Sequence, residues 1–120
     1  MEPIVDGCGF EIISLEALVR SHENGTSKHR SEMCSLYIRE NAEEFKMLRV
    51  EPPKEFQRFD LRLTVDNPED LVVCRHIFKS LHGYAPLIPL SDIIAFLDGN
   101  PSLISLIAPF TESGYQTMYL

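Results

Sequence analysis

Alternating apolar and polar residues at 59–66 form the clearest pattern in the chain. The apolar positions are Phe59, Leu61, Leu63 and Val65, and the polar positions are Asp60, Arg62, Thr64 and Asp66. A period of two is typical of a β-strand that buries one face. Short apolar runs at 9–13 and 47–50 predict two further strands, the second of which ends before Pro52.

Apolar residues at helical spacing predict four to five helices between and after these strands. Ser14 is a suitable N-cap for the first helix, and Asn67 followed by Pro68 is a suitable start for the helix that bears Leu71, Cys74, Phe78 and Leu81 on one face. Asn41 and Glu44 have the spacing of a capping box. The expected helices and turns span residues 14–25, 31–40, 41–45, 67–83, 91–99 and 100–107.

The order strand, helix, helix, strand, strand, helix, helix predicts an α/β fold. We expect a small fragment with three layers, about three strands and four to five helices, in a single domain over residues 1–120. So small a sheet has exposed edges, and exposed edges favour pairing with another chain. The sequence therefore predicts a homodimer.

Composition and charge narrow the classes of partner. The 120 residues contain 11 Lys+Arg and 18 Asp+Glu, which gives a formal net charge of -7. This acidic balance disfavours binding to nucleic acid, which needs a basic face. The longest apolar run, residues 103–108, is too short for a membrane span, and the first ten residues lack the pattern of a secretory signal. We expect a cytoplasmic protein without a membrane partner.

The cysteines and histidines indicate neither disulfides nor a metal centre. There are three cysteines, Cys8, Cys34 and Cys74, and an odd number without a framework spacing favours a reducing compartment. His29 and Cys34 are separated by a spacing that suits neither a zinc site nor one helix face. The cysteines lie in apolar patterns, which is typical of buried structural cysteine rather than of a nucleophile.

The strongest candidate for chemistry is Asp66, at the end of the alternating segment and directly before a helix. Open α/β sheets place ligands at such positions, and Mg²⁺ takes one or two protein carboxylates together with water and phosphate oxygens. A purely structural alternative is open. Asp66 and Asn67 can cap the following helix, while Glu69 and Asp70 favour the positive end of its dipole.

Residues 61–71, LRLTVDNPEDL, resemble a strand-turn-helix near the end of sugar-activating cytidylyltransferases. The family includes spore coat polysaccharide biosynthesis protein F and the acylneuraminate cytidylyltransferases. Residues 7–18, 31–46 and 91–103 and the ending ESGYQTM are similar to further family segments, in the same order. The resemblance implies the C-terminal half of a nucleotidyltransferase fold. It also implies a transferase that joins CTP to a sugar or sugar acid, with Mg²⁺, for surface polysaccharide biosynthesis.

The resemblance also implies roles for five residues. Asp66 matches an aspartate that helps to hold the metal, and Glu11 matches an acidic position near the sugar pocket. Arg62 matches a basic position within the motif and is a further candidate for substrate binding. Arg30 and Glu32 lie where relatives place polar groups near the substrate. The alternatives are a solvated strand face for Glu11 and, for Arg62, a cross-strand pair with Asp60 or another carboxylate.

Departures from the family pattern leave open whether this polypeptide is an enzyme by itself. The N-terminal half of the family, which binds the triphosphate, has no counterpart in the sequence, and no glycine-rich phosphate loop replaces it. Gly9 and Ala42 stand where many relatives have Asp and Pro. We expect a chain that is inactive alone and that needs a complementary N-terminal half. The alternative is a non-catalytic, dimerising interaction module on the same scaffold.

Overall fold

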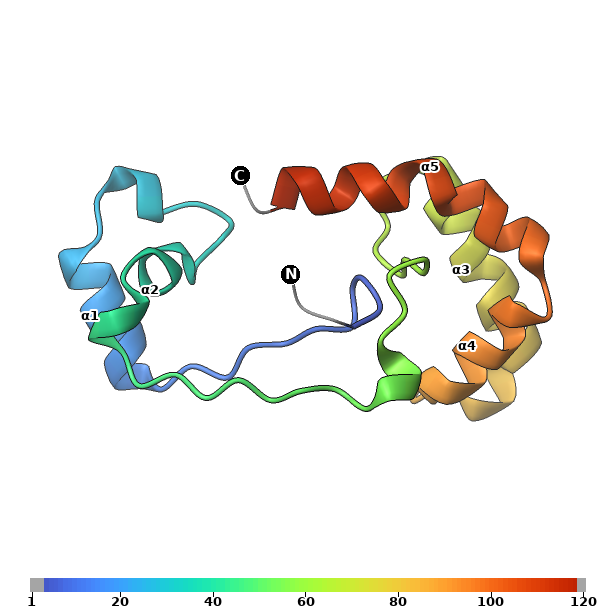
Figure 1. Ribbon diagram of the computed structural model, residues 1–120, viewed down its shortest axis with the longest axis horizontal. Helices are drawn as coiled ribbons and strands as arrows, with labels where there is room; N and C mark the ends of the chain where they lie inside the picture. Colours follow the sequence, from blue (N-terminus) through green and yellow to red (C-terminus); the bar gives the residue numbers. More distant parts are fainter. Residues whose placement is uncertain (1–3, 119–120) are drawn as a thin grey trace. The chain divides into compact units, whose positions relative to one another are not determined.

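The computed structural model describes residues 4–118, with the side chains of residues 4–113, and the chain divides into two compact units. The larger unit contains the described residues of Met1–Gly9 and Glu51–Leu120, and the smaller unit is Phe10–Val50. Figure 1 shows helices in both units. The single domain expected over residues 1–120 stays a prediction.

Three helices build the larger unit: α3 (Pro68–Leu81), α4 (Leu90–Asp98) and α5 (Pro101–Met118). They pack against one another, and two 3₁₀ turns, η3 (Lys54–Phe56) and η4 (His82–Tyr84), precede α3 and α4 (Figure 1). Their apolar faces close a core that also takes in two residues from outside the helices. The buried members of this core are Val5, Leu61, Val73, Ile77, Ile94, Leu97 and Ile107.

The predicted start of α3 is confirmed, but the helix buries a different face from the one expected. Asn67 and Asp70 form a capping box around Pro68, which occupies the first turn. The buried residues of α3 are Asp70, Val73 and Ile77, whereas Leu71 and Phe78 are exposed. Asp70 shares this face with the two core residues, and its carboxylate accepts a hydrogen bond from Arg62 inside the unit.

Helix α5 is longer than the short turn that the sequence predicts for residues 100–107. It continues through Pro109 to Met118, and its buried residues include Ile107 and Thr111. The Thr111 hydroxyl donates to the carbonyl of Ile107, 3.1 Å away. Proline removes one backbone hydrogen bond from a helix interior. Packing of α5 on the core of the larger unit outweighs that loss.

Among the described residues, no single helix is both long and apolar enough to cross a membrane. Helix α4 together with residues Pro101–Ser113 passes the test of length and composition as a pair, with a bend of 105°. The buried side chains of this pair, Ile94, Leu97 and Ile107, belong to the core of the larger unit.

The smaller unit contains α1 (Leu15–Asn24), α2 (Leu36–Glu40) and two 3₁₀ turns, η1 (Ser27–His29) and η2 (Ala42–Glu44). The predicted cap of α1 is confirmed, since the Ser14 hydroxyl accepts from the amide of Ala17 at 3.2 Å. The predicted start of the second helix at Ser31 is wrong, because α2 begins only at Leu36.

A further turn follows α2 as expected, but without the expected capping box. Residues 42–44 form η2, for which Asn41 provides no side-chain cap. The Asn41 amide instead donates back to the carbonyl of Tyr37, at 2.8 Å. The side chain therefore closes the end of α2 rather than opening the next turn.

The predicted α/β class is wrong, because the described residues contain helices and no β-strand or sheet. Within residues 59–66, the described β-pairing is a single isolated bridge between Arg62 and Asp6. Leu61 and Arg62 are both buried although they are neighbours, and Phe59 and Val65 are about half exposed. A strand requires a neighbour for its backbone groups. Here that neighbour extends over a single residue pair, so the alternation does not become a strand.

The two shorter segments that predicted strands also lie outside helices and sheets. Residues 9–13 and 47–50 run as open chain in Figure 1. Phe10, Ile12 and Leu48 on these segments are 81 %, 90 % and 89 % exposed. Apolar composition predicted burial on a sheet, but no described segment pairs with either of them.

Candidate functional site

The strongest candidate site lies at the N-terminus of α3, where one buried arginine meets three aspartates. The Arg62 guanidinium donates from Nε to Asp70 Oδ1 at 2.9 Å, and from Nη1 to Asp6 Oδ2 at 3.3 Å. Its Nη2 donates to Asp66 Oδ2 at 2.5 Å. These contacts join three separate stretches of the larger unit at one guanidinium group.

Asp70 is the centre of this cluster and is 1 % exposed. Its Oδ2 accepts the backbone N–H groups of Asp66 and Asn67, at 3.0 and 2.9 Å. Burial pushes the pKa of Asp70 upward, but the Arg62 guanidinium and these N–H donors outweigh burial, so the pKa lies below its ordinary value. A single carboxylate therefore both caps α3 and fixes Arg62.

Asp6 reaches the cluster through a tight turn that requires glycine. Gly7 has φ +89°, and a Cβ at this position would lie 2.8 Å from the backbone N of Thr64. The Thr64 hydroxyl also donates to Asp6 Oδ2, at 3.3 Å. The close approach of the two backbones at Gly7 places residues 4–9 against the segment that bears Arg62.

Asp66 differs from its two fellow aspartates because its side chain is 71 % exposed. Oδ2 is bound to Arg62, while within the described part of the chain Oδ1 has no hydrogen-bond partner. With all groups ionised, three carboxylates and one guanidinium leave a net charge of −2 at this place. The cluster thus presents an ordered, accessible carboxylate with an excess of negative charge.

This arrangement fits magnesium only as part of a larger ligand set. Within residues 4–118 no group of three His, Cys, Asp or Glu side chains is placed to hold a metal ion. Mg²⁺ commonly takes one or two carboxylates and completes its shell with water and phosphate oxygens. Asp66 can supply one such ligand, and the remaining ligands would come from substrate, water or another polypeptide.

Arg62 is placed to position Asp66 rather than to meet solvent. It is 5 % exposed, and each of its described hydrogen bonds goes to a carboxylate. Burial lowers the pKa of Arg62, but the bonds and charges of Asp70, Asp66 and Asp6 outweigh it and raise that pKa. The alternative of a cross-strand pair is met only in that Arg62 pairs with carboxylates: no strand is present among the described residues, and Asp60 pairs instead with Arg58 at 2.7 Å.

In the smaller unit, Glu11 is tied to α2. Its Oε1 accepts from Arg39 Nη2 at 2.6 Å and from Nε at 3.1 Å. Burial pushes the pKa of Glu11 upward, but the Ser35 hydroxyl and Arg39 outweigh it and lower that pKa. The carboxylate is 39 % exposed, so this pair orders the side chain without enclosing it.

Arg30 and Glu32 lie on the loop between η1 and α2, and both are exposed. Arg30 lines an open hollow of about 650 Å³ in the smaller unit, together with Leu18, Val19 and Cys34 among others. Glu32 is not part of that lining. The five predicted site residues are divided between the units, and their substrate roles stay predictions.

Two aspartates of the cluster, Asp70 and Asp6, differ in how far the sequence predicts their roles. Asp70 stands three residues after Asn67, which is the spacing of a capping box, so its buried acceptor role was accessible to pattern analysis. Asp6 is separated from Arg62 by 56 positions, and no local pattern connects them. The motif alone does not reveal these partners, so it predicts a substrate-binding role for Arg62 as readily as a carboxylate pair.

Comparison with known proteins returns a distant relative without an assigned activity. The chain is 29% identical over 113 residues to uncharacterized protein MJ1063 of Methanocaldococcus jannaschii. The match covers 94% of this chain and 46% of the relative, so the chain spans about half the length of that protein. No family model and no solved structure matches the chain. The resemblance to cytidylyltransferases therefore stays a prediction.

Proposed function

We propose that this chain is the C-terminal part of a cytidylyltransferase-like protein that activates a sugar or sugar acid with CTP. Two facts support the proposal. Several segments resemble that family in the same order along the chain, and the matched relative is about twice as long as the part that corresponds to this chain. The chain supplies the sugar-side residues and one magnesium ligand, and another polypeptide segment supplies the nucleotide-binding half.

The observation that carries this proposal is the state of Asp66. One of its oxygens is held by the buried Arg62, and the side chain remains 71 % exposed at the start of α3. A fixed and accessible carboxylate costs little reorganisation when a cation binds. Bound magnesium would neutralise charge on the phosphates of CTP. In this scheme Asp66 of the larger unit binds the metal and Arg62 holds Asp66, while Glu11, Arg30 and Glu32 of the smaller unit are candidate sugar ligands through the resemblance alone.

The chain is expected to be inactive by itself. Transfer at a phosphate needs positioning and neutralisation of several negative charges. The sequence has no glycine-rich phosphate loop, and its net charge is -7. One carboxylate with its arginine cannot meet both needs, so activity requires the complementary half.

The test measures pyrophosphate release from CTP with Mg²⁺ and a panel of sugar acids. The chain is assayed alone and after co-expression with the part of the M. jannaschii relative that the match leaves uncovered. Release is expected only in the co-expressed sample. Background release from every sample, together with a stable dimer of the chain, would favour the non-catalytic interaction module instead.

Asp66→Ala is expected to lower the complemented rate by about 100-fold or more, which is the scale for loss of a group that stabilises charge in the transition state. Asp92→Ala is the matched control, because Asp92 is an acidic residue in the first turn of α4. Circular dichroism checks that both variants are folded. Unchanged turnover in Asp66→Ala would contradict the metal role, and loss of helix content would identify Asp66 as a structural residue.

A further inference from the structure

The open segments, residues 9–13 and 46–51, expose more large apolar side chains than a folded surface normally carries in so short a stretch. Ile12 is 90 % exposed and Leu48 is 89 % exposed, which is close to complete exposure. The exposed large apolar residues on the two open segments are Phe10, Ile12, Met47, Leu48 and Val50. They are not scattered singly, since they fall on two runs that flank the smaller unit in sequence.

The backbone of the open segments is also unpaired. Within the described part of the chain, no backbone hydrogen bond is made by residues 9–13 or by residues 46–51. Open chain with free N–H and C=O groups and apolar side chains is a template for another extended segment. The main chain of both segments is thus unpaired within the described residues and their large apolar side chains are exposed, although Glu11 is held by Arg39.

The smaller unit lacks the apolar core that would make such exposure tolerable. Ile38 is its buried hydrophobic residue among those described, and the other buried residues are Ser21 and Ser35. A unit of about 40 residues usually needs additional stabilisation, such as a disulfide, a metal or association. The described cysteines are free, and no group of three metal-binding side chains is present among the described residues. Association with another polypeptide is therefore the source of stabilisation that we consider.

We propose that the open segments dock against the polypeptide that corresponds to the part of the M. jannaschii relative outside the match. Docking pairs the backbones of residues 9–13 and 46–51 with that polypeptide and covers their apolar side chains. The uncovered part is more than half of the relative, which is enough chain to supply such a surface. This inference rests on the proposed function, because the same polypeptide would supply the nucleotide-binding half.

A second copy of this chain is a poorer occupant of the open segments. Each copy has a formal net charge of -7, so self-association brings together two strongly acidic molecules. In the relative, the uncovered part belongs to the same polypeptide as the matched part. Association between them there does not depend on protein concentration. The proposal therefore commits to the complementary polypeptide and leaves the homodimer as an outcome of the test.

Hydrogen exchange combined with sedimentation tests this docking. The chain is measured alone and after co-expression with the uncovered part of the relative, so that neither part has to fold by itself. We expect a 1:1 complex in which amides of residues 9–13 and 46–51 exchange at least tenfold more slowly than in the chain alone. Absence of a complex, or a complex without protection of these amides, would overturn the proposal. A homodimer of the chain alone that protects the same amides would also overturn it.

Two variants assign the effect to the apolar side chains. Ile12→Glu and Leu48→Glu are each expected to weaken the complex by about tenfold or more, as for loss of a buried apolar contact at an interface. Leu87→Glu is the matched control, since Leu87 is an apolar residue of the larger unit that is 84 % exposed. It is expected to leave the complex unchanged. Equal weakening by all three variants would show that the open segments have no special role.

Failure of the docking and failure of the proposed function give different results. Asp66→Ala should form the complex with full protection of the open segments and should lose pyrophosphate release. A protected complex without release in the unmodified chain would refute the activity and leave the docking intact. Release without protection would refute the docking and leave the activity intact.

Discussion

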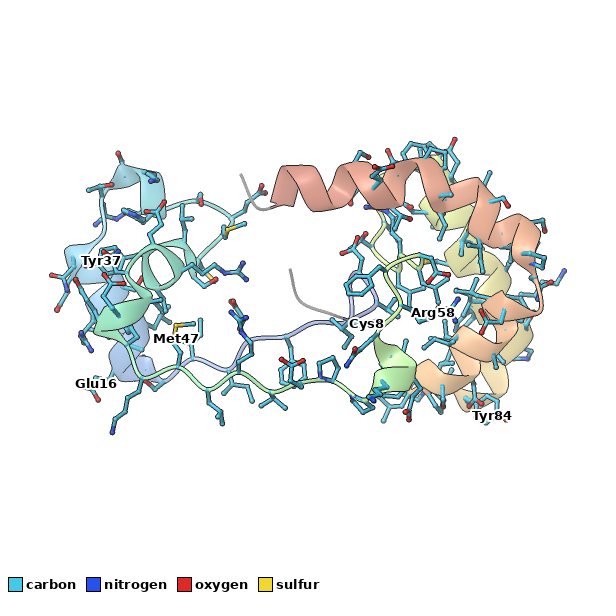
Figure 2. All side chains as sticks on the ribbon, in the orientation of Figure 1. Cys8, Glu16, Tyr37, Met47, Arg58 and Tyr84 are labelled. Carbon is cyan, nitrogen blue, oxygen red and sulfur yellow. The ribbon has the colours of Figure 1, made fainter. Side chains whose placement is uncertain are left out.

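The two units of this chain differ in where their apolar residues lie. In the larger unit, Leu61, Leu97 and Ile107 are fully buried between α3, α4 and α5. In the smaller unit, Ile38 is buried, while Phe10, Ile12 and Leu48 are almost fully exposed. Figure 2 shows many side chains projecting from the open segments between labelled residues Cys8 and Met47. Both units contain apolar residues, but among the described residues these pack into a shared core in the larger unit.

The smaller unit is stabilised by polar and aromatic contacts rather than by a large apolar core. Arg20 lies over the ring of Phe45 at 4.7 Å, and Tyr37 packs edge-on against both His29 and Phe45. These side chains are half-buried, and each contact of this kind contributes about 0.5–1.5 kcal/mol to stability. The larger unit therefore buries its large apolar side chains against one another, whereas the smaller unit leaves several of them exposed, as the proposed docking requires.

Arg62→Met gives the sharpest test of the larger unit. Loss of the guanidinium leaves Asp6 and Asp70 buried without their cation, which should cost about 3–5 kcal/mol of unfolding free energy. Urea denaturation measures this loss. Arg58→Met is the control, because Arg58 pairs with Asp60 and Asp98, which are both about half exposed, and its loss should be much smaller. Equal losses of unfolding free energy in the two variants would show that burial of the Arg62 cluster adds nothing to its stabilising effect.

Leu97→Ala compares the cores of the two units directly. A fully buried leucine leaves a cavity when shortened, so the free energy of unfolding should fall by about 2–5 kcal/mol. Ile38→Ala should instead affect the smaller unit and leave the amides of α3 protected from hydrogen exchange. Loss of α3 protection in Ile38→Ala would contradict the division of stability between the units.

Acid should unfold the larger unit through Asp70. Its pKa lies below the ordinary value of 3.8, so it stabilises the fold fully above that pH. The contribution is lost as the pH falls through the lowered pKa, because protonation removes the bonds to Arg62 and to the cap of α3. Thermal unfolding between about pH 6 and about pH 3 should show this fall, and Asp70→Asn should flatten it. An identical pH profile in the variant would contradict this role of Asp70.

Glu11→Gln should have the smallest effect. The Glu11–Arg39 pair is more than a third exposed on both sides, so its loss should change stability by at most about 1 kcal/mol. Hydrogen exchange in α2 is the measurement, and the effect should shrink in high salt because exposed pairs are screened. Glu23→Gln, on an exposed residue of α1, is the control. A large loss of stability in Glu11→Gln would contradict this prediction, because it would show that the exposed Glu11–Arg39 pair stabilises the smaller unit strongly.

Local signals predicted the helix boundaries well where they depended on close neighbours. Ser14 and Gly25 mark the ends of α1, and Asn67 with Pro68 marks the start of α3. Such caps act within three or four residues, so the sequence contains all the information they need. The alternation at 59–66 failed for the opposite reason. A strand exists only with a partner, and the described chain offers one bridge.

The candidate site shows the same division between local and distant information. From the sequence alone came the position of Asp66 beside a helix start and the place of Asp70 in the first turn of that helix, because both depend on residues within one turn. Only the tertiary structure showed that Arg62 is buried among carboxylates, since Asp6 reaches it across 56 positions. Only the tertiary structure also showed which face of α3 is buried: Asp70, Val73 and Ile77 face inward, whereas Leu71 and Phe78 are exposed. Contacts between distant segments depend on the whole fold, and no spacing along the chain encodes them.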